Sequence, residues 1–115
     1  MEEQELINIA KEAYLLAKQL GALEEGLKDR KNAMGLEAYM KNYNLILSKA
    51  KRLLKNDEVI LASINHLEPH DYPESYSYEQ KFSEIGGDVP ILKEALFTFY
   101  EFHFPKKEKD KIGFR

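Results

Sequence analysis

Residues 3–28 of the chain read EQELINIAKEAYLLAKQLGALEEGLK. Apolar residues recur along this stretch at alternating spacings of three and four: Leu6, Ile9, Ala13, Leu16, Leu20, Leu23 and Leu27. Such spacing over three heptads is typical of a long amphipathic helix. Gly21 and Gly26 lie off this seam, and each costs about 1 kcal/mol relative to alanine in a helix interior. The pattern predicts either one helix over about 3–28 or a helix that stops near Gly21 and continues as an irregular turn.

A second apolar seam follows a polar corner at residues 29–33. Its members have the same alternating spacing: Leu36, Met40, Tyr43, Leu47, Ala50 and Leu54. This seam predicts an amphipathic helix over residues 33–55. The outer side of that helix is rich in cations, and we call this set the basic face: Lys41, Lys49, Lys51, Arg52 and Lys55.

The next segment carries the signals of a third helix. Residues 56–58 read Asn-Asp-Glu, which suits a cap followed by an acidic first turn. Apolar residues then recur at helical spacing as far as Leu67, and Pro69 follows. The sequence therefore predicts a helix over 57–67 that ends before Pro69.

The C-terminal part of the chain predicts two more helices. Residues 77–80, Ser-Tyr-Glu-Gln, have the pattern of a capping box, which predicts a short helix over 78–85. The glycine pair at 86–87 has the composition of a helix end. Pro90 then suits the first turn of a last helix over about 89–104.

Together these segments predict an all-α protein. We expect an antiparallel helical bundle of four main helices plus one short helix, because no stretch reads as a strand. The bundle would form a single domain over 1–104, followed by a flexible basic tail over 105–115. The core is expected to include the following residues: Leu16, Leu20, Leu23, Tyr43, Leu47, Leu61, Ile64, Leu96 and Phe99.

The predicted last helix is unusually apolar. On a helical wheel one face carries Leu92, Ala95, Leu96, Phe99, Phe102 and His103. Further aromatic residues widen this arc past half of the circumference, whereas a helix that packs one stripe needs an arc nearer about 100°. The helix is therefore either central in a monomer or in contact with another protein. We favour contact, as a homodimer or with a protein partner, through Phe97, Tyr100 and Phe104, with Ile112 and Phe114 of the tail as further anchors.

Composition excludes several classes of function. The chain has 115 residues, a net charge of −3 and no cysteine, so it is one domain without disulfides or thiolate chemistry. No apolar run approaches the roughly 20 residues of a membrane helix. The acidic N-terminus does not resemble a signal peptide, so we expect a cytoplasmic protein. Glycine-rich phosphate loops, GxSxG, HExxH and EF-hand patterns do not occur.

One loop contains residues that could bind a metal. His66, His70, Asp71 and Glu74 lie within nine residues of one another, and imidazole and carboxylate groups suit zinc or a similar divalent ion. The alternative is an exposed acidic loop, because Pro69 separates the two histidines along the chain. A metal site there would make the protein a small metal- or nucleotide-dependent hydrolase.

The sequence favours a non-enzymatic interaction or scaffold protein with no catalytic residues and no cofactor. The hydrolase is one alternative. A nucleic-acid-associated accessory protein that uses the basic face is another. The basic face has no interleaved aromatic residues and belongs to an acidic protein, so the sequence disfavours a nucleic-acid partner.

Overall fold

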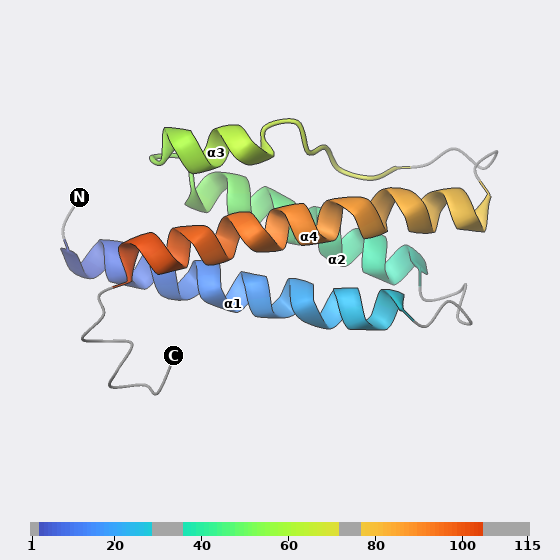
Figure 1. The fold of residues 1–115 in the computed structure, drawn as a ribbon, viewed down its shortest axis with the longest axis horizontal. Coiled ribbons are helices and arrows are strands. Elements are labelled where there is room, and N and C mark those ends of the chain that lie inside the picture. The colour runs from blue at the N-terminus through green and yellow to red at the C-terminus, as the bar shows by residue number, and fades with distance from the viewer. Residues whose placement is uncertain (1–2, 29–35, 72–76, 105–115) are drawn as a thin grey trace.

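The computed structural model describes residues 3–28, 36–71 and 77–104, with the side chain of Tyr78 left out. These residues form four helices that pack against each other and no strand: α1 (Glu3–Leu27), α2 (Leu36–Leu53), α3 (Glu58–Ile64) and α4 (Tyr78–His103). The prediction of an all-α helical bundle is confirmed. In Figure 1 the chain runs from left to right along α1 and from right to left along α2 and α4.

Helix α1 continues through both glycines, so the first of the two alternatives for this segment is correct. A β-carbon at Gly21 would meet no neighbouring atom within 4 Å. At Gly26 it would lie 2.6 Å from the hydroxyl oxygen of Tyr39 in α2. The absence of a side chain at Gly26 therefore leaves room for the Tyr39 ring of α2 against the end of α1.

Helix α3 is shorter than the sequence predicts. Asp57 caps it, as expected for this segment, and accepts a hydrogen bond from the backbone N–H of Ile60 at 3.1 Å. The helix ends at Ile64, three residues before the predicted end at Leu67. Leu67 is nevertheless buried. Leu67 therefore belongs to the core although it lies after the end of α3, and its apolar side chain does not indicate a further helical turn.

The last two predicted helices are a single helix, and the predicted break at residues 86–87 is wrong. The capping box at Ser77 and Gln80 is confirmed by both of its hydrogen bonds. From there α4 runs without interruption to His103 and includes Pro90. One continuous buried seam crosses the glycine pair: Phe82, Ile85, Val89, Leu92, Leu96 and Phe99. Burial of this seam outweighs the local cost of two glycines and a proline.

Helix α4 is the central helix of the bundle. Its most extensive contact is with α1, and it also packs against α2 and α3. The ring of Tyr14 in α1 lies 4.9 Å from that of Tyr100 and 6.0 Å from that of Phe97. Lys93 adds an ion pair with Glu24 of α1 at 2.6 Å. The contacts of Tyr100 and Phe97 with Tyr14, together with the buried seam, cover much of the broad apolar arc of α4 within one chain.

The predicted core is largely confirmed. Eight of the nine residues predicted for the core are buried. The exception is Leu61, which is half-buried at the edge of the core. The predicted tail, residues 105–115, lies outside the described residues. No described helix combines the length and apolar character that a membrane span requires.

Candidate functional site

Large apolar side chains are exposed at five positions in the described part of the chain: Leu15, Leu45, Val59, Ile91 and Phe102. They are not scattered, because each lines a groove between two helices. Val59, Ile91 and Phe102 share one groove, and the two leucines line neighbouring grooves on another side of the bundle. Exposed apolar surface that gathers in this way marks a binding surface more often than a single exposed leucine does.

The first groove lies between α3 and α4, and we call it the α3–α4 groove. Its lining residues come from both helices: Val59, Ile60, Ser63, Pro90, Ile91, Glu94, Ala95, Thr98 and Phe102. Val59 is 82% exposed and Phe102 is 77% exposed, so both side chains project from its walls. Glu94 carries the only charge among these lining residues. The surface is therefore apolar with a single acidic group.

Two histidine–aspartate pairs fasten the α3 segment to α4. At the start of the segment, Asp57 Oδ2 lies 3.0 Å from His103 Nε2. Beyond its end, His70 Nε2 lies 2.8 Å from Asp88 Oδ2. These polar contacts thus hold the two helices that form the α3–α4 groove together, one before α3 and one after it.

His70 is also fixed to α2. The side-chain amide of Asn44 donates to the His70 carbonyl at 2.8 Å and accepts from the His70 backbone N–H at 2.7 Å. The ring of His70 packs edge-on against Tyr43 at 5.0 Å. Burial, with the charge of Asp88 as a second cause, raises the pKa of Tyr43 above its ordinary value. Tyr43 therefore stays protonated and serves as a packing residue in this cluster.

The carboxylate of Asp57 has a lowered pKa. Partial burial by itself would raise this pKa. The hydrogen bonds from the Ile60 backbone N–H and from His103 outweigh burial, so the pKa of Asp57 lies below its ordinary value of 3.8. The folded state therefore favours the charged form of Asp57.

This lowered pKa predicts a loss of stability in acid. A carboxylate with a depressed pKa stabilises the fold above its unfolded pKa and loses that contribution as the pH falls through its folded pKa. We expect Asp57→Asn, which retains a capping oxygen, to lower the melting temperature at pH 6. The gap to the unmodified protein should close below pH 3.8. Thermal unfolding followed by circular dichroism measures both melting temperatures. A difference in melting temperature that is the same at every pH would contradict the lowered pKa of Asp57.

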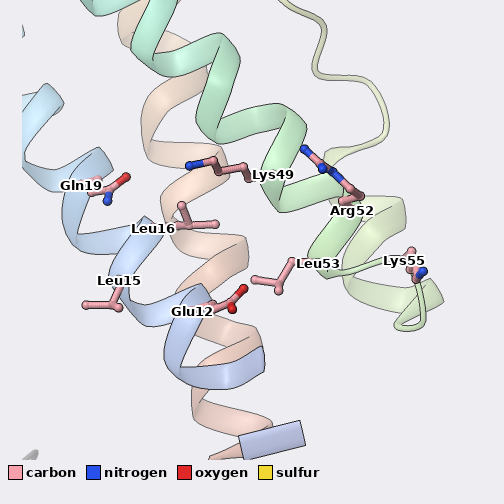
Figure 2. A pocket seen from close by; sticks show the side chains of 8 residues that line it. All are labelled: Glu12, Leu15, Leu16, Gln19, Lys49, Arg52, Leu53 and Lys55. Carbon is pink, nitrogen blue, oxygen red and sulfur yellow. The ribbon is translucent and has the colours of Figure 1, made fainter. Parts of the chain in front are cut away.

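A second groove lies between α1 and α2, and we call it the α1–α2 groove (Figure 2). Its lining residues are Glu12, Leu15, Leu16, Gln19, Lys49, Arg52, Leu53 and Lys55. In Figure 2 the Lys49 side chain extends from α2 toward α1, above the apolar side chains of Leu16 and Leu53. Three cations and one carboxylate line this groove. An adjoining hollow shares Gln19 and Lys49 with it and adds the exposed Leu45.

The basic face is divided between structural and exposed roles. Lys51 donates to the backbone carbonyl of Leu67 at 2.6 Å and so helps to hold the segment after α3. Lys41 lies 3.8 Å from Glu37 on the same helix. Lys49, Arg52 and Lys55 line the α1–α2 groove. Of the five cations, Lys51 is therefore tied into the fold, whereas Lys41 remains largely exposed and the other three lie along the groove.

The aromatic residues predicted to form an interface lie mainly inside the chain. Tyr100 and Phe104 are buried within the chain and stack at 5.0 Å, and Phe97 is half-buried beside Tyr14. Ile112 and Phe114 lie outside the described residues. Phe102, which the helical wheel groups with Leu96 and Phe99 on one face, is exposed, whereas these two residues are buried.

The exposure of Phe102 could be predicted from the polar residues that precede it at helical spacing. It lies four residues after Thr98 and eight after Glu94, on the same side of α4 as these polar residues. On α4, therefore, Phe102 presents an aromatic ring on the outer surface, whereas the ring of Tyr100 is buried within the chain.

The structure does not bring the predicted metal ligands together. His66 and Asp71 are exposed, whereas the side chain of His70 is buried and bound to Asp88. Glu74 lies outside the described residues. Within residues 3–28, 36–71 and 77–104, no three histidine, aspartate or glutamate side chains lie close enough together to hold a metal ion.

Comparison of the chain with protein-family models, with curated proteins and with solved structures finds no match.

Proposed function

We propose that this protein is a non-enzymatic interaction protein that binds a protein surface in its α3–α4 groove. The observation that carries this proposal is the gathering of Val59, Ile91 and Phe102 around one groove. Aromatic side chains such as Phe102 bury roughly 150–250 Å² each and contribute strongly to the free energy of protein interfaces. The simplest partner is a second copy of the chain, which makes the protein a homodimer or a larger self-assembly.

The geometry around the groove supports an interaction role over a catalytic one. The lining holds one ionisable group, Glu94, and two hydroxyl side chains, Ser63 and Thr98, with no second ionisable group to form a pair. General acid–base chemistry needs a titratable pair within hydrogen-bond reach of a substrate. The two histidines that contact aspartates fasten α3 to α4, and so their side chains act in the fold.

Replacement of Phe102 by serine tests this proposal. Phe102 is 77% exposed, so the variant should fold with an unchanged helical content. We expect the mass of the unmodified protein to rise above 13.4 kDa as its concentration increases from about 10 µM to about 1 mM, because small interfaces are transient. Loss of the phenyl ring should weaken this association at least about tenfold. Light scattering coupled to size exclusion measures both.

A matched control is Ser83→Asn, which changes another exposed position of α4 outside the groove. It should associate like the unmodified protein. The proposal is wrong if Phe102→Ser associates as strongly as the unmodified protein, or if the latter keeps a mass of 13.4 kDa over the whole range.

A further inference from the structure

The two grooves have opposite charge. Lys49, Arg52 and Lys55 line the α1–α2 groove together with one carboxylate. In the α3–α4 groove the single charged lining residue is Glu94. Exposed glutamates also precede two of its apolar residues, Glu58 before Val59 and Glu101 before Phe102. Residues 57–71 contain four acidic residues and neither lysine nor arginine.

Both grooves also expose large apolar surface. Leu15 is exposed in the α1–α2 groove, and Val59, Ile91 and Phe102 are exposed in the α3–α4 groove. With Leu45 in the adjoining hollow, these residues are all of the large exposed apolar side chains in the described part of the chain. Two surfaces of this kind bury apolar area and pair opposite charges when they meet.

We propose that the α3–α4 groove of one molecule binds the α1–α2 groove of a second copy of the same chain. This inference rests on the proposed function and names its partner surface. The grooves belong to different helix pairs, so one molecule can use both at once. Contact between them is head-to-tail, and such an interface produces rings or open chains and not only dimers. The alternative, two α3–α4 grooves face to face, places Glu94 of one copy near the same acidic surface of the other.

Two single variants and their mixture test the proposal. Leu15→Ser removes an apolar contact from the α1–α2 groove, and Phe102→Ser does so in the α3–α4 groove. Both residues are exposed, at 58% and 77%, so both variants should fold, which circular dichroism checks. Each variant alone should associate at least about tenfold more weakly than the unmodified protein.

The equimolar mixture should recover one full-strength contact. The intact α3–α4 groove of Leu15→Ser can bind the intact α1–α2 groove of Phe102→Ser, whereas the two altered grooves cannot extend the assembly. The mass of the mixture should therefore stop at twice 13.4 kDa, while that of the unmodified protein continues to rise with concentration. Association should also weaken as ionic strength increases from about 0.05 M to about 0.5 M, because exposed charges are then screened.

The failures of the two proposals differ in this experiment. If Leu15→Ser associates as strongly as the unmodified protein while Phe102→Ser does not, the head-to-tail contact is wrong and the α3–α4 groove remains the docking surface. A mixture that associates no better than either variant alone also overturns the head-to-tail contact. Undiminished association of Phe102→Ser overturns the proposed function itself.

Discussion

Replacement of Leu96 by alanine is expected to lower the free energy of unfolding by about 2–5 kcal/mol. Leu96 has no exposed surface and lies on the buried seam of α4, the helix that contacts the other three. Truncation removes apolar contacts and leaves a cavity that the surrounding helices fill only in part. Because a small domain is stable by only about 5–15 kcal/mol, the variant can lose much of its stability.

Urea denaturation followed by circular dichroism measures this loss. The matched control is Leu45→Ala, the same chemical change at a position that is 55% exposed. We expect the control to change the free energy of unfolding by no more than about 0.5 kcal/mol. Equal effects of the two substitutions would contradict the central position of α4.

Replacement of both Gly86 and Gly87 by alanine is expected to stabilise the protein by about 1–2 kcal/mol. Both glycines lie inside α4, and a β-carbon at either position would meet no atom within 4 Å. Neither has the positive φ angle that would favour glycine. Alanine in a helix interior is better than glycine by about 0.5–1 kcal/mol per residue, because it lowers the entropy of the unfolded chain.

The sign of this effect distinguishes the continuous helix from the two helices that the sequence predicts. If residues 86–87 ended one helix in a left-handed turn, alanine would be strained there and the double variant would be less stable. The measurement is again urea denaturation, and the two single variants show whether the contributions add. A loss of stability in the double variant would restore the predicted break.

The sequence predicts those elements whose signals are local and agree with each other. The seam from Leu6 to Leu27 and the capping box at Ser77 and Gln80 both lead to the observed helices. At Gly86 and Pro90 the local signals indicate a break, but the seam from Phe82 to Phe99 continues across them. Here burial against α1 decides the structure, and propensity is the weaker influence.

The candidate site could be predicted only in part, because it depends on how helices meet. The basic face was predicted, but the part of it that lines a groove depends on the position of α1 beside α2. His70 resembles a metal ligand beside His66, yet its partner is Asp88, eighteen residues away. The α3–α4 groove depends on the position of α3 along α4, which the buried Ile60 and Ile64 and the two histidine–aspartate pairs hold, and no local pattern indicates such pairs.

The most direct test of the docking surface is hydrogen–deuterium exchange at two protein concentrations, about 10 µM and about 1 mM. We expect slower exchange in the concentrated sample for peptides covering residues 59–63 and 90–102, which form the α3–α4 groove. Peptides from residues 79–84, which lie outside both grooves, should exchange at the same rate in both samples. Slower exchange confined to residues outside 59–63 and 90–102, or none at all, would contradict the account.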